Sequence, residues 1–401
     1  MTLLNHVHGR LSALGLQCSI VGNELHVHRE PRPVKIKFEE DWCNEYQEYK
    51  RARSISFDAE TRSFQRNNSF EFQVTRLAAV AQLAPEQYNL VDEGGHTVTI
   101  GSASHSFSFG FFDSPAYDEF FKIRVKSRLL DRDIFVRRAS QIFWSPMTAV
   151  YTHKGRKTPL DLKEKALSAI RASLFKVAVE QHECFSVWKP RKPHLKYLYF
   201  PESKFDNSIP HVTYEENVVS FYKVAKASPF PSQSFLAYYN VLEYYFLRVS
   251  ELLLHDRLAS LLNYPGFRAN REALDKVISA VRGQDSRSDE TEMLRNVLDR
   301  FVQESDLIDF IQKFEELCGD KIYSKRRQVF GESLQISLIK DHALANSAKV
   351  LKHIRNAIVH SSDRYKREEC HIPLSDSEAV IEEFVPLIRF FAERVIFGTA
   401  S

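Results

Sequence analysis

The pattern of apolar residues changes near residue 230, and this change restricts the folds open to the chain. Before it, short runs rich in β-branched and aromatic residues alternate with turn residues, which is typical of strands. After Ser228-Pro-Phe-Pro231, apolar residues recur at the spacing of amphipathic helices. The 401 residues, 43% of them hydrophobic, are enough for more than one core. We therefore predict an α+β protein, with a mixed α/β N-terminal module followed by an all-α helical bundle.

Three parts are predicted from this change and from the turn residues. Residues 1–150 form the mixed module, residues 151–230 a connecting region with one helix and short strands, and residues 231–401 the helical domain. Strands are expected at 17–21, 24–28, 34–38, 54–57, 69–76, 97–100, 106–112, 134–143, 194–200 and 210–222. Helices are expected at 114–130, 158–182, 232–262, 270–281, 289–304, 306–317, 340–360 and 375–397.

Local signals support two of these segments. Phe107, Phe109 and Phe111 alternate with small residues, which is the period-two pattern of a half-buried strand. Ser232 is the expected N-cap of the helix at 232–262, because a serine hydroxyl accepts a hydrogen bond from a free amide of the first turn.

The expected helix at 340–360 carries three polar residues beside an apolar stripe. At about 100° per residue, Arg355, Asn356 and His360 lie away from the apolar side. The apolar side consists of Val350, Leu351, Ile354, Ala357 and Ile358. Packing of the buried face against a core does not require these three polar residues. They are therefore candidates for a chemical role.

These residue types together favour cleavage of a phosphodiester without a metal ion. An imidazole can take or give a proton near neutral pH. A guanidinium binds phosphate oxygens and offsets the charge that develops on them, and the amide of Asn356 can orient the phosphate or the ring of His360. Two such helices packed across a two-fold axis would bring two sets of these residues into one cleft.

The run Arg355-Asn356-Ala357-Ile358-Val359-His360 resembles the signature of the HEPN superfamily, an Arg separated by four to six residues from a His. A polar residue commonly follows that Arg, as Asn356 does here. The aromatic segment from Ser234 to Phe246 is similar to the opening helix of ApeA-like HEPN domains, which carries a Glu. The resemblance covers about residues 231–397.

The resemblance implies an all-helical, usually dimeric domain that cleaves RNA without a metal or cofactor and leaves a 2′,3′-cyclic phosphate. Such domains act as toxins and in abortive infection and antiphage defence. The resemblance therefore implies catalytic roles for Arg355, Asn356 and His360. The N-terminal module is then expected to sense a phage-derived trigger or to regulate cleavage.

Further residues have both a functional and an ordinary interpretation. Glu243 lies among aromatic residues and is expected either to orient Arg355 or to be a helix-surface carboxylate. His353 is either a second base or a surface neighbour of His360. Basic residues on both sides of the motif would hold an RNA backbone, or belong to solvated loops: Lys325, Arg326, Arg327, Arg364 and Lys366.

Composition limits the remaining possibilities. The net charge is only +3, so any RNA contact must be a local patch rather than a generally cationic surface. Five scattered cysteines have no spacing of a zinc site or a disulfide framework, which fits a reducing cytoplasm. No apolar run has the length of a membrane span, and no signal peptide is recognised.

The N-terminal module contains two weaker candidate sites. The pairs His6 with His8 and His26 with His28 have a spacing that brings ligands together only on a strand, and the first pair is expected on a helix. Another set, Asp58, Glu71 and Gln73, resembles the acidic core of restriction-type nucleases, with Gln73 at the position where that pattern has a Lys.

Our functional expectation is a cytoplasmic, homodimeric, metal-independent RNA endonuclease of antiphage defence. Two alternatives remain. In the first, the helical domain is a non-catalytic scaffold that dimerises and binds RNA or a nucleotide. In the second, the chain is a DNA-directed restriction component that uses Asp58 and Glu71.

Overall fold

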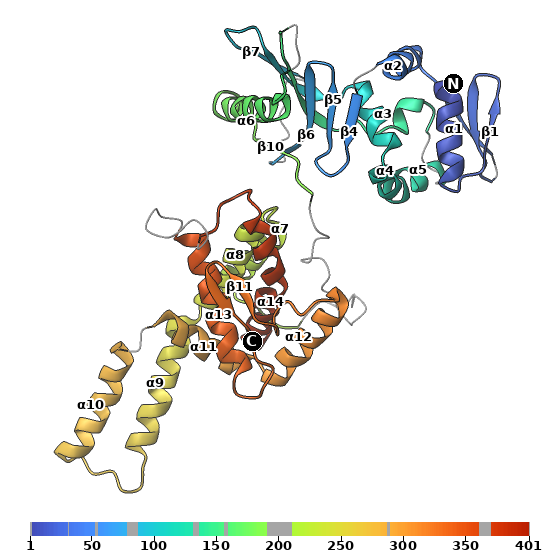
Figure 1. Cartoon of the computed structure of the whole chain (residues 1–401). Coiled ribbons are helices and arrows are strands. Elements are labelled where there is room, and N and C mark those ends of the chain that lie inside the picture. Colours follow the sequence, from blue (N-terminus) through green and yellow to red (C-terminus); the bar gives the residue numbers. More distant parts are fainter. Residues whose placement is uncertain are drawn as a thin grey trace. The chain divides into compact units, whose positions relative to one another are not determined.

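A computed structural model describes most of the chain as two compact units, Met1–Pro190 and Arg191–Ser401 (Figure 1). The described residues are 2–30, 32–52, 55–77, 87–130, 136–155, 159–190, 211–286, 289–360 and 370–400. The first unit holds strands and helices, and the described part of the second is helical apart from one hairpin. The predicted α+β class is therefore confirmed.

The N-terminal unit begins with a three-stranded antiparallel sheet that packs against helix α1 (Leu3–Ala13). Its strands are β1 (Cys18–Val21), β2 (Glu24–Val27) and β3 (Val34–Lys37). Gly22, with φ of 63°, lies in the turn between β1 and β2, where a positive φ suits the tight hairpin. All three strands agree with the sequence prediction, whereas helix α2 (Glu40–Arg51), which follows them, was not predicted.

A larger antiparallel sheet follows, in the order β4-β5-β6-β9-β8-β7, with β10 paired to β6. Its strands are β4 (Ile55–Asp58), β5 (Ser63–Arg66), β6 (Ser69–Arg76), β7 (Tyr88–Val91), β8 (Thr97–Ser102), β9 (Met147–Thr152) and β10 (Phe185–Val187). Helix α6 (Leu162–Gln181) packs against β6, β8, β9 and β10 (Figure 1). Its buried stripe, which includes Ile170 and Leu174, joins Phe70 and Phe72 of β6 in one core.

The segment predicted as a strand at 106–112 is instead helix α3 (His105–Asp113), so that prediction was wrong. Ser104 caps this helix, since its hydroxyl oxygen accepts a hydrogen bond from the amide of Phe107 at 3.0 Å. Every residue from 106 to 112 is buried. A helix that is covered on all sides has no polar face, and its sequence therefore has no helical period.

The other predictions for residues 114–200 had different outcomes. The expected helix at 114–130 is confirmed as a continuous helical run of α4 (Ala116–Phe120), the π-helix Phe121–Val125 and α5 (Lys126–Leu130). The expected strand at 134–143 was wrong over its described residues, which contain only a short 3-10 helix, Ala139–Gln141, and one bridge between Arg138 and Lys37. The strand expected at 194–200 lies outside the described residues.

The C-terminal unit is a helical bundle built around α8 (Pro231–Glu243) and α14 (Ser377–Gly398), which pack on each other. The other helices are α7 (Glu216–Ala227), α9 (Phe246–Leu262), α10 (Arg271–Ser286), α11 (Glu290–Phe301), α12 (Glu304–Cys318) and α13 (Ala343–Val359). A hairpin of β11 (Arg327–Val329) and β12 (Glu332–Leu334) precedes α13. The strand expected at 210–222 was wrong, because α7 occupies most of it.

The predicted helix at 232–262 is divided at Tyr244 and Tyr245 into α8 and α9. Its N-cap is Phe230, with Pro231 in the first turn, so Ser232 is not the cap. The amide and the hydroxyl of Ser232 instead donate hydrogen bonds to Glu378 of α14 at 3.1 and 2.9 Å.

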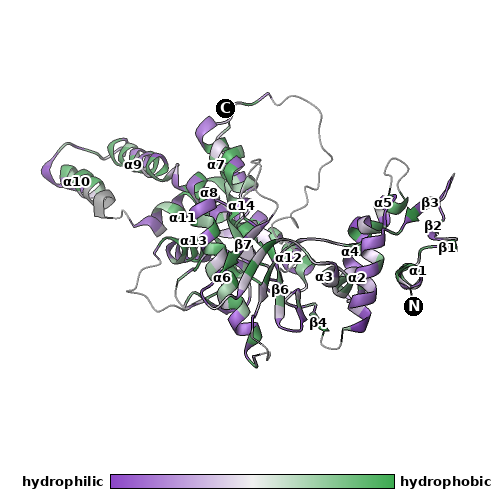
Figure 2. Cartoon of the chain, turned by 90° about the horizontal axis from the view of Figure 1, so that it is seen from above, coloured by the Kyte–Doolittle hydropathy of each residue, from purple (hydrophilic) through white to green (hydrophobic). Residues whose placement is uncertain are grey.

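The predicted connecting region at 151–230 is shared between the two units. Strand β10 completes the N-terminal sheet, and α7 packs on α8 of the C-terminal unit. Figure 2 shows hydrophilic residues along the described helices, including the pair α9 and α10, and none of these helices is long and apolar enough to cross a membrane.

Candidate functional site

Helix α13 positions the Arg-Asn-His motif. Its apolar side is buried as predicted: Val350, Leu351, Ile354 and Ala357 are buried, and Ile358 packs against the same core. At the first turn, the Glu304 carboxylate accepts a hydrogen bond from the amide of Ala343 at 2.8 Å. At the other end, the amide of His371 donates to the carbonyl of Ala357 at 2.9 Å, so the returning chain satisfies one of the last free carbonyl groups.

Arg355 is held by groups from three helices. Its Nη1 donates a hydrogen bond to Oδ1 of Asn356 at 3.2 Å, and its Nε lies 3.5 Å from Oε1 of Glu290, at the start of α11. The guanidinium carbon lies 5.9 Å from the ring centre of Tyr239, on α8. The side chain of Arg355 is nevertheless 23% exposed, so it remains accessible to a solvent-borne phosphate.

The carboxylate that pairs with Arg355 is Glu290, and the expected pairing with Glu243 is not found among the described residues. Glu243 is exposed at the end of α8. Tyr239 donates its hydroxyl proton to Oε1 of Glu290 at 2.8 Å. Burial, and to a smaller extent Glu290, raises the pKa of Tyr239. The hydroxyl therefore stays protonated and orients the Glu290 carboxylate toward Arg355. No pattern in the sequence connects Glu290 with Arg355, because only the packing of α11 on α13 brings them together.

His360 follows the last residue of α13, so the motif helix ends one residue before its predicted end. Its amide still donates to the carbonyl of Asn356 at 2.8 Å, while its side chain is exposed. The carbonyl of His360 accepts a hydrogen bond from the thiol of Cys370 at 3.3 Å. The backbone of His360 is therefore fixed at both polar groups while the imidazole faces solvent.

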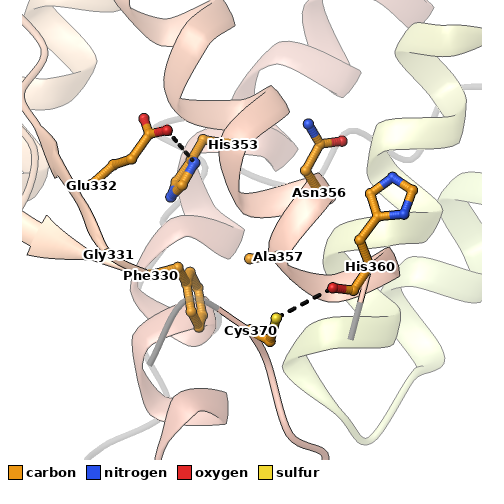
Figure 3. Close-up of a pocket in the computed structure, with 8 residues that line it drawn as sticks. All are labelled: Phe330, Gly331, Glu332, His353, Asn356, Ala357, His360 and Cys370. Atoms are coloured by element: carbon orange, nitrogen blue, oxygen red, sulfur yellow. Dashed lines mark hydrogen bonds and ion pairs between the residues drawn. The ribbon is translucent and has the colours of Figure 1, made fainter. Parts of the chain in front are cut away.

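A pocket of about 440 Å³ lies beside the end of α13 (Figure 3). Figure 3 shows Asn356 and His360 at one side of the pocket and His353 with Glu332 at the other. The turn of the β11–β12 hairpin forms part of the wall, and Phe330 and Gly331 in this turn have φ of 48° and 80°. The lining residues are Phe330, Gly331, Glu332, His353, Asn356, Ala357, His360 and Cys370.

His353 connects α13 to the hairpin. Its Nε2 lies 2.9 Å from the carbonyl oxygen of Val329, and its Nδ1 lies 3.5 Å from Glu332. A ring with both nitrogens engaged in this way is poorly placed to act as a second base. The structure thus favours a positioning role for His353.

The basic residues before the motif lie on the hairpin or next to it, outside the pocket lining. Arg327 donates from Nη2 to Glu383 at 2.8 Å, and Arg326 donates from Nε to the Ser333 hydroxyl at 2.7 Å. Lys325 is exposed. The two other candidates for RNA contact, Arg364 and Lys366, lie outside the described residues.

A buried histidine that sequence reasoning missed holds the chain that returns after the motif. His371 is 2% exposed, and its Nδ1 lies 2.8 Å from the Ser377 hydroxyl and its Nε2 3.3 Å from Glu378. Burial raises the pKa of Glu378, but His371 and the Ser232 donors outweigh this effect and lower it overall. Because the folded-state pKa is lowered, Glu378 contributes stability above its unfolded pKa, and this contribution is lost as pH falls through the folded pKa.

The histidine pairs of the N-terminal unit have separate partners. His6 lies on α1, with Nε2 2.6 Å from Asp113, and His8 contacts the carbonyl of Cys18 at 3.1 Å. His26 lies 3.5 Å from Glu24, and His28 lies 3.2 Å from the Ser19 hydroxyl. Across the described ranges, no three His, Cys, Asp or Glu side chains are grouped as a metal would require.

The residues that resemble a restriction-type acidic core, Asp58, Glu71 and Gln73, also interact with separate partners. Glu71 is buried and accepts hydrogen bonds from the amide and hydroxyl of Ser104, at 2.9 and 2.6 Å, and from Thr148 at 2.8 Å. Burial raises the pKa of Glu71 despite these donors. Asp58 contacts Lys163 at 3.3 Å, and Gln73 accepts from Arg62 at 3.1 Å. Glu71 thus anchors the start of α3. The register of β4, β5 and β6 aligns Asp58 with Ser63 and Phe72, so Asp58 lies on the opposite face of the sheet from Glu71 and Gln73 and the three side chains do not converge on one site.

No protein-family model, curated protein or solved structure matches the chain. The geometry around α13 and the resemblance of the motif are therefore the features of the chain that bear on function.

Proposed function

We propose that the C-terminal unit is a metal-independent RNA endonuclease of the HEPN type, with Arg355, Asn356 and His360 as its catalytic residues. The supporting observation is that Arg355 is oriented by Glu290 and hydrogen-bonded to Asn356, while the exposed His360 lies beside Asn356 at the same pocket. The proton-transfer group of His360 and the amide of Asn356 thus line one accessible pocket, and Arg355, which is not part of its lining, is linked to it through the hydrogen bond to Asn356.

In the proposed reaction, the imidazole of His360 removes the proton from a ribose 2′-hydroxyl. The 2′-oxygen attacks the adjacent phosphorus, and the bond from phosphorus to the 5′-oxygen breaks. The products are a 2′,3′-cyclic phosphate and a 5′-hydroxyl, which receives its proton from a second histidine or from water. Arg355 offsets the charge on the non-bridging oxygens, and Asn356 orients the phosphate.

We propose that two copies of the helical unit form a homodimer with both motifs in one cleft, so that one His360 acts as base and its twin as acid. In this proposal the N-terminal unit senses a phage-derived trigger or restrains cleavage, because an unregulated ribonuclease would kill its host. The biological role would then be antiphage defence in the cytoplasm.

The direct experiment is incubation of the purified chain with total RNA in EDTA, followed by analysis of the new ends. Fragments that end in a cyclic phosphate would support the proposal. RNA that stays intact, even after an extract of phage-infected cells is added, would favour the alternative function. In that alternative the helical unit is a scaffold that binds RNA without cutting it.

The position of Glu290 leads to a paired prediction. Glu290→Gln keeps the hydrogen-bonding shape but removes the charge that orients Arg355, so we expect the RNA cleavage rate to fall roughly tenfold. Glu243→Gln makes the same chemical change at the exposed end of α8 and should leave the rate within about twofold of the wild type. Single-turnover cleavage of a labelled RNA measures both. A larger loss with Glu243→Gln would show that the other carboxylate serves Arg355.

A further inference from the structure

A second pocket, of about 1100 Å³, lies in the N-terminal unit between β3 and the segment 136–138. Six basic residues and two acidic residues, Glu24 and Glu39, line it. We call it the basic groove. The basic residues are Arg29, Arg32, Lys35, Lys37, Arg137 and Arg138.

The fold of this region places the basic residues on the outward face. Along β3, Val34 and Ile36 are buried while Lys35 and Lys37 are exposed, as expected for a strand with one face on a core. The segment 136–138 lies along β3, because the amide of Lys37 donates to the carbonyl of Arg137 at 2.9 Å. Arg137 and Arg138 are both exposed, so cations line both walls of the groove.

The two carboxylates do not balance these cations. Glu39 is occupied by the turn at 139–141, accepting from the amide of Ala139 at 3.0 Å and from the Ser140 hydroxyl at 2.5 Å. Glu24 lies 3.8 Å from Lys37. Neither Arg32 nor Lys35 has a hydrogen-bond or ion-pair partner within the described ranges of the chain. The groove therefore carries an excess of positive charge, which the net charge of +3 for the whole chain conceals.

The groove also has apolar parts. Pro33 and Phe38 line it beside the cations, and Phe38 is only half-buried. A cationic wall suits phosphates, since guanidinium groups bind their oxygens in a fork. An aromatic or proline surface suits the flat face of a base. The volume is of the order found for sites that hold small organic ligands.

We propose that the basic groove binds a phosphorylated nucleotide, either free or as part of a single-stranded nucleic acid. The phosphates contact Lys35, Arg138 and Arg32, and the base lies against Phe38. This inference is independent of the ribonuclease proposal, because the groove belongs to the N-terminal unit and uses none of the motif residues.

The test compares three ligands on the full-length chain by calorimetry: ATP, inorganic tripolyphosphate and a 2′-O-methyl RNA that cannot form a cyclic phosphate. The variant Lys35→Glu/Arg138→Glu reverses two exposed charges of the groove. We expect it to weaken binding of ATP at least about tenfold, because two charge-assisted contacts are lost. The matched control Lys122→Glu/Lys126→Glu reverses two exposed charges outside the groove and should leave the affinity unchanged.

Each outcome decides a part of the proposal. Groove-dependent binding of ATP that is tighter than that of tripolyphosphate supports a free nucleotide. Groove-dependent binding of the RNA alone supports a nucleotide within a strand. Equal affinity for ATP and tripolyphosphate, or binding that both double variants leave unchanged, would overturn the proposal. RNA cleavage, measured separately on the same variants, keeps this result distinct from the fate of the ribonuclease proposal.

Discussion

His360→Ala is expected to lower the rate of RNA cleavage by about 10²- to 10⁴-fold, the range that removal of a general acid or base produces. The side chain is exposed, and the hydrogen bonds at this position come from the backbone, so the fold should be unaffected. The other histidine among the described residues that line the pocket, His353, is poorly placed to replace it, because its ring is engaged by Val329 and Glu332. Cleavage of a labelled RNA in EDTA measures the loss.

A matched control is His255→Ala, which removes an exposed histidine of α9 in the same unit. It should retain the wild-type rate. In cells, sites of RNA cleavage mapped with the wild type should disappear with His360→Ala, together with any growth arrest. Cleavage that persists at the wild-type rate in His360→Ala would refute the assigned role of this residue.

Phe109→Ala is expected to lower the free energy of unfolding of the N-terminal unit by about 3–5 kcal/mol, the usual cost of removing a buried phenylalanine. Phe109 is 1% exposed. Its ring centre lies 5.3 to 5.5 Å from those of four neighbouring rings, most of them in edge contacts. These neighbours are Trp42, Tyr46, Tyr49 and Phe143. Thermal and urea unfolding of the chain measure the change.

Phe175→Ala provides the control for this change. Phe175 belongs to α6 of the same unit and is 72% exposed, so the same substitution removes almost no buried surface. We expect an effect within about 0.5 kcal/mol of zero. Comparable losses for the two variants would contradict the burial of Phe109 in the core of the N-terminal unit.

Segments with one buried face and one solvated face were predictable. On α13 the period of apolar residues identified the buried stripe correctly, and on α6 it identified the helix. The turn at Gly22 was predictable because its conformation is a local property. Helix α3 was not predictable in this way, since the core surrounds it and removes the polar half of the pattern. The division at Tyr244 and Tyr245 also escaped prediction, because the buried Tyr245 reaches a distant partner, Thr399, at 3.0 Å.

For the candidate site, the sequence by itself identified the residues proposed to carry chemistry: Arg355, Asn356 and His360 stand in one short run, the first two on α13 away from its apolar side and the third just after its last residue. Only the tertiary structure decided which groups act on them. Glu290 and Tyr239 contact Arg355, and Val329 engages His353, although these pairs are far apart in the chain. Helical periodicity in the sequence indicates which side of a helix is buried. An ion pair between residues of two helices depends on how these helices pack in the folded chain.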